Sequence, residues 1–95
     1  GKSKIIIQQN LYRMKLEIIS PDKLVFSGEV DSVNLPGGGG RFTVLPRHAA
    51  LISSLLNGEL SYTMEGATTT IKIDGGFAEV KEDTIYVCVE NIIEE

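Results

Sequence analysis

Residues 59–74, ELSYTMEGATTTIKID, carry the pattern that decides the fold class of this chain. Apolar and polar side chains alternate from residue 60 to 64 and again from 69 to 73, on either side of Glu65-Gly66-Ala67. Alternation with a period of two places successive side chains on opposite faces of a β-strand. A glycine between two such runs is typical of a tight turn. The stretch therefore predicts two antiparallel strands joined by a hairpin.

The same alternation recurs on both sides of this hairpin. Helical periodicity is absent from every window of the sequence, and β-branched and hydroxyl side chains within residues 49–56 favour a strand, or a strand and a turn, there. Turn-forming residues separate the runs at roughly the 8–12-residue spacing of a β-sandwich or barrel. These turns are expected at Pro21-Asp22-Lys23, Pro36 through Gly40, Asn57-Gly58, Gly75-Gly76 and Lys81-Glu82-Asp83. The pattern predicts a single all-β domain.

The composition is that of one small globular domain. Of the 95 residues, 42% are hydrophobic and 23% are charged, and no apolar run approaches the roughly 20 residues of a membrane-spanning helix. The formal net charge of −4 disfavours binding to nucleic acid, because acidic side chains repel phosphates. Cys88 is the single cysteine, so it cannot form an internal disulfide or, by itself, a zinc site.

The first thirteen residues differ from the rest of the chain. They contain one apolar run, Ile5-Ile6-Ile7, and lack the longer apolar stretch of a secretory signal. Met14 opens the alternating region, as an initiator methionine would. We therefore predict that residues 1–13 are a leader or a segment added for expression, and that residues 14–95 form the domain. An extra edge strand built on residues 5–7 is the alternative.

No motif in the sequence carries the signature of an active site. The glycine run 37–40 is followed by Arg41 and Phe42 instead of the lysine and hydroxyl of a nucleotide-binding loop, and favours a flexible turn. His48, the only histidine, has no nearby nucleophile in a recognisable motif and no further metal ligands at suitable spacing. The carboxylates show no paired spacing for acid–base catalysis. We expect no catalytic, cofactor-binding or metal site, and the residues favour a binding or structural module over an enzyme.

FTVLPRHAAL at residues 42–51 is the most distinctive of five segments that occur in a fixed order. The other four are residues 16–21, 25–30, 56–60 and 75–80. Together they resemble the N-terminal β-domain of the epsilon subunit of F-type ATP synthases, whose best-known stretch reads Gly-Ile-Leu-Pro-Gly-His-Ala-Pro-Leu. The resemblance implies an all-β, flattened sandwich or barrel of about ten short strands.

The chain departs from the family pattern at several positions. Thr43 and Arg47 stand where the family usually has glycine, and Ala50 stands where it has proline. Arg41 falls where many members have an acidic residue in the loop that approaches the membrane ring, so it is expected to reverse the sign of one contact. The sequence ends at Glu95, directly after the last expected strand. The resemblance implies a C-terminal helical hairpin, which inhibits ATP hydrolysis in many epsilon subunits, and these 95 residues are not expected to contain it: either the chain is a naturally short member or the sequence is a truncated piece.

The resemblance also implies a function. It makes the domain a non-catalytic rotor subunit in the central stalk of a proton-translocating F-type ATP synthase, linking the gamma subunit (γ) to the membrane c-ring. The expected location is peripheral, on the cytoplasmic face of a bacterial inner membrane, with no cofactor, no nucleic acid and no membrane insertion of its own. The family's partner-facing loops fall on five positions, which we expect to contact γ or the c-ring: Ser20, Gly40, Arg41, Arg47 and His48.

Two other function classes are alternatives. A free-standing β-sandwich could bind a peptide or a small ligand, with the glycine run as a lid. An enzyme centred on His48 would need a carboxylate or a hydroxyl within hydrogen-bond reach of the imidazole. Co-purification with γ, no turnover, and an exposed apolar patch instead of a closed pocket would favour the rotor subunit.

Overall fold

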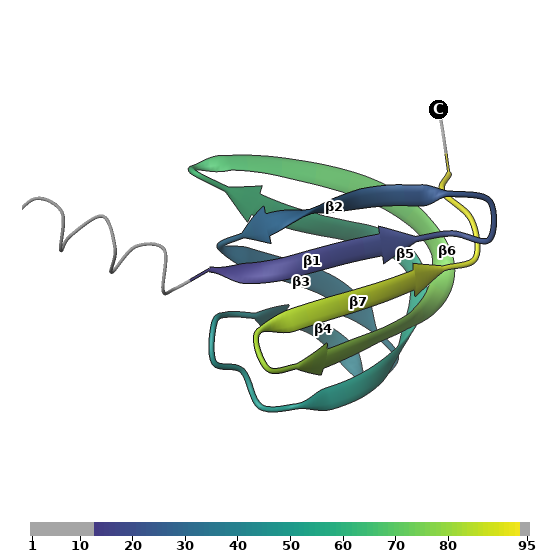
Figure 1. The fold of residues 1–95 in the computed structure, drawn as a ribbon. Coiled ribbons are helices and arrows are strands. Elements are labelled where there is room, and N and C mark those ends of the chain that lie inside the picture. Colours follow the sequence, from purple (N-terminus) through teal and green to yellow (C-terminus); the bar gives the residue numbers. More distant parts are fainter. Residues whose placement is uncertain (1–12, 94–95) are drawn as a thin grey trace, which may run out of the picture.

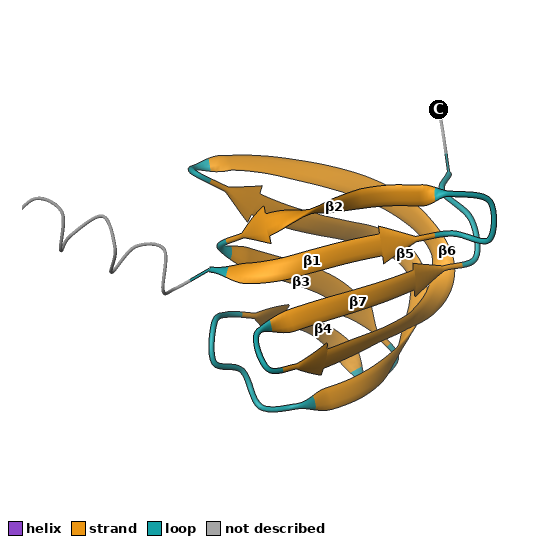
Figure 2. Ribbon diagram, viewed as in Figure 1, coloured by secondary structure: helices purple, strands orange, loops and turns teal. Residues whose placement is uncertain are grey.

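The structure, a computed structural model, describes residues 13–93, which contain strands and turns but no helix (Figure 2). No helix within this range, therefore, is long and apolar enough to cross a membrane. The all-β class predicted from the alternation is confirmed. The strands are β1 (Met14–Ile19), β2 (Leu24–Val30), β3 (Ser32–Gly37), β4 (Gly40–Val44), β5 (Leu51–Met64), β6 (Ala67–Lys81) and β7 (Thr84–Val89).

The strands form one sheet in the order β2-β1-β7-β6-β5-β3-β4. Neighbours are antiparallel except β1 and β7, which are parallel. β5 and β6 are long and strongly curved, so the sheet folds back on itself into two facing layers (Figure 1). The β1 layer comprises β2, β1, β7 and the paired segments 76–81 of β6 and 51–55 of β5. The β3 layer comprises β4, β3 and the paired segments 57–64 of β5 and 67–74 of β6.

Two glycines allow β6 to pass from one layer to the other. Gly75 and Gly76 have left-handed backbone conformations, with φ of +94° and +144°. A Cβ atom on Gly76 would overlap the backbone carbonyl oxygen of Cys88 in β7. Only glycine therefore fits the backbone conformation and the close approach of β7 at this bend.

The register of β5 against β6 changes at the same place. Pairing runs from Leu51 to Leu55, where Leu55 faces Gly76, and resumes where Asn57 faces Asp74. The turns predicted at Asn57-Gly58 and Gly75-Gly76 are thus wrong, because these residues lie inside continuous strands. For this reason the described residues form seven strands, two of them long, in place of the about ten short strands expected. The turn predicted at residues 65–67 is confirmed, with Glu65 and Gly66 as its central residues.

The core lies between the two layers and consists of the inward positions of the alternation. Phe26 on β2 and Tyr62 on β5 stack across the layers, with ring centroids 4.3 Å apart. Within residues 13–93 no polar or charged residue is buried, so the core is stabilised by apolar burial, at about 1.5–3 kcal/mol for each fully buried aliphatic side chain. The buried residues are Met14, Leu16, Ile18, Val30, Val33, Leu35, Val44, Leu55, Leu60, Tyr62, Ile73, Ala78, Val80, Ile85, Val87 and Val89.

The four-glycine run forms a tight hairpin. Gly37 and Gly40 pair as the end residues of β3 and β4, so only Gly38 and Gly39 form the turn. The N–H of Gly38 donates a hydrogen bond to the carbonyl of Ser54 on β5 at 2.9 Å. The turn is therefore shorter and better anchored than the flexible loop expected from four glycines in a row.

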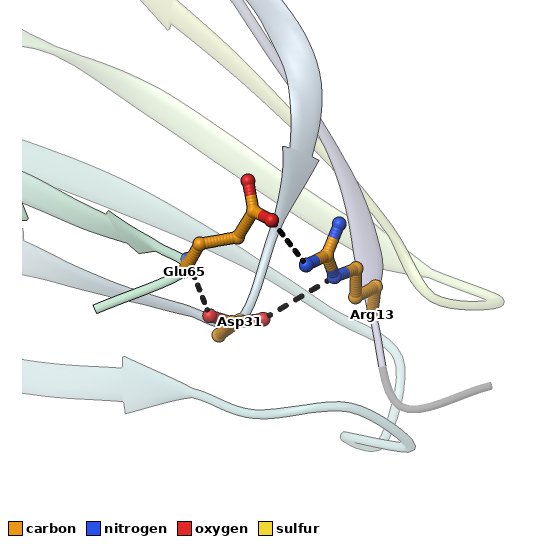
Figure 3. A network of polar contacts seen from close by, with 3 residues as sticks. All are labelled: Arg13, Asp31 and Glu65. Carbon is orange, nitrogen blue, oxygen red and sulfur yellow. Dashed lines mark hydrogen bonds and ion pairs between the residues drawn. The ribbon is translucent and has the colours of Figure 1, made fainter. Parts of the chain in front are cut away.

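Arg13, the first described residue, is tied to the domain by two ion pairs (Figure 3). Its Nε lies 3.6 Å from Oδ1 of Asp31, and its Nη2 lies 3.5 Å from Oε1 of Glu65. The N–H of Glu65 donates to Oδ2 of Asp31 at 2.9 Å. These contacts join the start of β1 to the β2–β3 connection and the β5–β6 turn. The rest of the predicted leader, and the alternative strand at residues 5–7, lie outside the described residues.

Candidate functional site

The outer face of the β1 layer carries exposed apolar side chains from four strands. Ile52 on β5 is 75% exposed, Phe77 on β6 51%, Tyr86 on β7 46% and Ile19 on β1 41%. The register places Ile19 and Phe77 on either side of Cys88, so these side chains are neighbours across the sheet. We term this surface the apolar patch, comprising Ile19, Ile52, Leu56, Phe77, Tyr86 and Cys88. In the register of the sheet Glu79 lies between Ile52 and Tyr86, and Glu17 lies on the other side of Tyr86, so two carboxylates interrupt the patch. Exposed apolar surface of this kind is typical of a protein–protein interface.

The outer face of the β3 layer is polar instead. Its outward positions include Asn34, Thr43, Ser61, Thr63, Thr68 and Thr70. The side-chain amide of Asn34 donates to Oγ1 of Thr43 at 2.9 Å, and the hydroxyls of Thr63 and Thr68 are 3.1 Å apart. These polar side chains form hydrogen bonds with one another, and they can also bond to water. The two outer faces thus differ in how much apolar side-chain surface they expose.

An open groove of about 420 Å³ lies between β4 and the start of β5. Its lining brings together Gly40, Arg41 and His48, three of the five positions expected to contact a partner. The groove also includes Ile52 of the apolar patch, so the two features are continuous. The complete lining is Gly39, Gly40, Arg41, Phe42, His48, Leu51, Ile52 and Ser53.

The guanidinium of Arg41 is held against the β3 layer. Nε and Nη2 donate to Oδ1 of Asn34 at 2.9 and 2.6 Å, and Nη2 also donates to the backbone carbonyl of Glu59 at 2.6 Å. All of these acceptors are neutral, so they fix the side chain without neutralising its charge. A guanidinium that is already positioned and still charged is a good binding group for a carboxylate.

Arg47 and His48 lie in the connection between β4 and β5. Arg47 has φ of +67°, and its N–H donates to Oδ1 of Asp83 at 2.6 Å. Nδ1 of His48 lies 2.8 Å from the carbonyl of Ala49; because a carbonyl only accepts, Nδ1 carries the proton and Nε2 can accept a hydrogen bond. Within residues 13–93 the imidazole is thus bonded to a backbone carbonyl, whereas the enzyme hypothesis requires a carboxylate or a hydroxyl there.

Ser20 lies apart from the groove, in the turn between β1 and β2. Its N–H and its hydroxyl both donate to the carbonyl of Lys23, at 3.0 and 3.4 Å. It borders a second hollow of about 170 Å³, together with residues of the segment that follows β7. Because Ser20 directly follows Ile19, it adjoins the apolar patch and not the groove.

The described residues offer no assembled metal site. Within residues 13–93, no three or more His, Cys, Asp or Glu side chains gather closely enough to hold a metal ion. Cys88 is a free, half-buried thiol among the side chains of the apolar patch.

The apolar patch is the part of the site that the sequence pattern did not single out. A signal for it exists in the alternation, because Ile19 follows the inward Ile18 and must point outward. For Ile52 and Phe77, the face on which the side chain lies depends on the bend in β5 and β6. The sequence pattern had predicted two turns at this bend. The outward positions of these strands could be assigned only once the layers were known.

Comparison with known proteins finds relatives of this domain. A family model described as "ATP synthase, Delta/Epsilon chain, beta-sandwich domain" matches residues 13–95. The ATP synthase epsilon chain of Nitratidesulfovibrio vulgaris (strain DP4) is 45% identical over 78 residues, which are 82% of this chain and 58% of that protein. The ATP synthase epsilon chain of Leptospira borgpetersenii serovar Hardjo-bovis (strain JB197) is 36% identical over 80 residues, 84% of this chain and 63% of that protein. The chain thus spans about three fifths of the length of these relatives.

Two solved structures contain chains with the same fold. One is the mitochondrial ATP synthase of Euglena gracilis (OSCP/F1/c-ring, rotational state 1), with a TM-score of 0.82, 21% identity, and coverage of 86% of this chain and 53% of that chain. The other is the central stalk and c-ring of the Tetrahymena thermophila mitochondrial ATP synthase, with a TM-score of 0.73, 13% identity, and coverage of 85% and 66%. At these identities the likeness shows that the β-sandwich fold is shared.

Proposed function

This chain belongs to the ATP synthase delta/epsilon chain family through its β-sandwich domain, and we propose that it is a non-catalytic rotor subunit of the central stalk. In this role it links γ to the c-ring of a proton-translocating F-type ATP synthase and supports rotational coupling. Its proposed location is peripheral, on the cytoplasmic face of a bacterial inner membrane. The coupling role needs only the β-domain and does not depend on an inhibitory helical arm.

The observation that carries this proposal is the apolar patch on the β1 layer. Ile52 and Phe77 are 75% and 51% exposed, so a partner that covers them removes substantial apolar surface from water. Fully burying one such side chain contributes up to about 1.5–3 kcal/mol before the costs of association are subtracted. An exposed ion pair contributes only about 0–1 kcal/mol. We therefore assign most of the affinity for γ to the apolar patch.

The groove and the β1–β2 turn supply the remaining contacts in this proposal. Gly40, Arg41 and His48 line the groove, and Arg47 adjoins His48 in the connection that leads into it. Ser20 lies in the β1–β2 turn, next to the apolar patch. Contacts spread over these regions resist shear better than a single cluster would, and a close-packed sandwich transmits torque because its interior deforms little.

Complex formation with γ tests the proposal. The whole chain and the purified γ subunit of the same ATP synthase are mixed and analysed by size-exclusion chromatography with light scattering. We expect a stable one-to-one complex and no ATP hydrolysis by the chain alone. Absence of a complex at micromolar concentrations would contradict the rotor role and would favour the alternative, a free-standing module that binds a peptide or a small ligand in the groove.

A further inference from the structure

Glu79 is a carboxylate in the middle of the apolar patch. In the register of the sheet it lies between Ile52 on β5 and Tyr86 on β7. Phe77 precedes it by two residues on the outer face of β6. These three neighbours are exposed, whereas Glu79 itself is half-buried. Because opposite side chains in neighbouring strands are only about 4.5–5.5 Å apart at Cβ, a partner that covers the three neighbours must cover this carboxylate too.

The carboxylate of Glu79 has no counter-charge within residues 13–93. The ion pairs in this range involve other carboxylates, among them Glu17, which lies 3.6 Å from Nζ of Lys15. The exposed part of the Glu79 side chain is hydrated in the free chain. A carboxylate that is buried without a counter-charge or hydrogen-bond donors is strongly unfavourable. A partner that displaces this water must therefore bring a cation or donors to the same point.

The ring of Tyr86 determines which of these groups fits best. A guanidinium is planar, stacks on an aromatic ring, and donates two parallel hydrogen bonds to one carboxylate. It is also less strongly hydrated than an ammonium, so it loses less when it is buried at an interface. An arginine side chain can thus contact the Tyr86 ring and the Glu79 carboxylate together. Its aliphatic stem can lie against Ile52 or Phe77.

We propose that γ presents an arginine to this site, where the guanidinium stacks on Tyr86 and pairs with Glu79. This inference rests on the proposed function, which supplies γ as the partner that covers the apolar patch. The apolar neighbours then provide most of the affinity, and the ion pair fixes the orientation of γ on the sheet. A surface without a cation at this point is rejected, because it leaves a buried carboxylate unpaired. Glu79 and Tyr86 thus determine specificity at this interface.

A second copy of the chain is a less suitable occupant. It carries the same net charge of −4, which opposes self-association. The chain has three arginines: Arg13 is ion-paired at the Asp31 corner, Arg41 is bonded over the β3 layer, and Arg47 lies in the β4–β5 connection. None of these three positions belongs to the apolar patch. A second copy that used the same face would therefore bring no guanidinium to Glu79.

The substitution Glu79→Gln tests the ion pair through the sign of its effect. Calorimetric titration measures the affinity of γ for the whole chain and for the variant. We expect the affinity to fall by about tenfold to a hundredfold, because the guanidinium loses its counter-charge where water is excluded. If γ covers Glu79 without a cation, the neutral amide is easier to bury and the affinity rises. An unchanged or raised affinity would overturn the inference while leaving the rotor role intact.

Two control variants separate this site from general effects of charge. Glu59→Gln removes the same charge from an exposed position of β5 in the β3 layer. Lys81→Gln removes a charge two residues away from Glu79 on the same strand. Both should leave the affinity for γ within about twofold. If Lys81→Gln weakens binding as much as Glu79→Gln does, Lys81 is the counter-charge in the complex and the inference is overturned.

Two substitutions of Tyr86 test the stacking. Tyr86→Phe keeps the ring and should leave the affinity unchanged, whereas Tyr86→Leu keeps an apolar side chain without a ring and should weaken binding by about fivefold. Equal affinities for these two variants would overturn the inference. Light scattering of the chain alone checks the second copy, and a dimer that Glu79→Gln dissociates would also overturn it. If the unchanged chain does not bind γ at all, the proposed function fails and this inference fails with it.

Discussion

The backbone N–H of Arg47 donates to Oδ1 of Asp83 at 2.6 Å, and both residues have left-handed backbone conformations, with φ of +67° and +58°. This hydrogen bond joins the β4–β5 connection to the β6–β7 turn and fixes the residue that precedes His48. A residue other than glycine pays about 1–2 kcal/mol for the left-handed conformation. The bond to Asp83 offsets part of that cost, which explains how arginine stands where the family pattern has glycine.

The pair Arg47→Gly and Arg47→Val tests this backbone conformation. Glycine relieves the left-handed strain but gives the unfolded chain more freedom, so we expect the free energy of unfolding to change by less than about 1 kcal/mol. A β-branched residue such as valine is strongly disfavoured in the left-handed conformation, so Arg47→Val should lower the free energy of unfolding by about 2 kcal/mol or more. Both variants remove the arginine side chain, so the difference between them reports the backbone alone. Chemical denaturation that gives the same loss for both would contradict the left-handed assignment.

Gly76→Ala should destabilise the bend in β6. The added Cβ overlaps the Cys88 carbonyl and the backbone has φ of +144°, so we expect the free energy of unfolding to fall by more than about 2 kcal/mol. Gly66→Ala is the matched control, because Gly66 also has a positive φ but its Cβ would meet nothing within 4 Å. If thermal denaturation shows equal losses for the two variants, the close approach of β7 to Gly76 is not what limits this position.

Asp31 should matter more to stability than Arg13, although the two are ion-paired (Figure 3). Asp31→Ala removes the acceptor of the Glu65 N–H in the β5–β6 turn and is expected to cost about 1–2 kcal/mol. Arg13→Gln removes only partly exposed ion pairs and should cost less than about 1 kcal/mol. Urea denaturation measures both values. A larger loss for Arg13→Gln would show that the ion pairs, and not the hydrogen bond, hold this corner.

Cys88 offers a direct report on the apolar patch. It is the only cysteine in the chain and lies between Ile19 and Phe77 in the register of the sheet. We expect γ to slow the reaction of this thiol with a maleimide, because the partner would cover the patch. Labelling rates with and without γ are compared by mass spectrometry. An unchanged rate in a mixture where the complex demonstrably forms would place γ on another face of the sandwich.

The sequence predicted the strands well but not the path of the sheet. Alternation identified the segments because burial of one face demands apolar residues at every second position, as in β1 and β7. Asn57-Gly58 and Gly75-Gly76 looked like turns because the same residue types serve both a turn and a bend within a strand. Only the pairing of distant segments distinguishes the two, and that pairing is set by tertiary packing.

The candidate site was predictable in part for a similar reason. Motif resemblance selected Gly40, Arg41 and His48, which the structure brings into one groove, whereas Ser20 lies elsewhere. The hydrogen bonds that fix Arg41 involve Asn34 and Glu59 on two other strands, and no local pattern reveals them. Whether any of these residues touches γ or the c-ring stays a prediction.

The affinity of γ for chains altered on the two outer faces tests the central claim most directly. Calorimetric titration at several temperatures compares the unchanged chain with Phe77→Ser in the apolar patch and Thr70→Ala on the polar face. We predict a negative heat-capacity change on binding, a loss of affinity of about tenfold or more for Phe77→Ser, and no change for Thr70→Ala. Because Phe77 is 51% exposed, the fold should survive its replacement. Equal affinities for all three chains, or no binding to γ by the unchanged chain, would contradict the account.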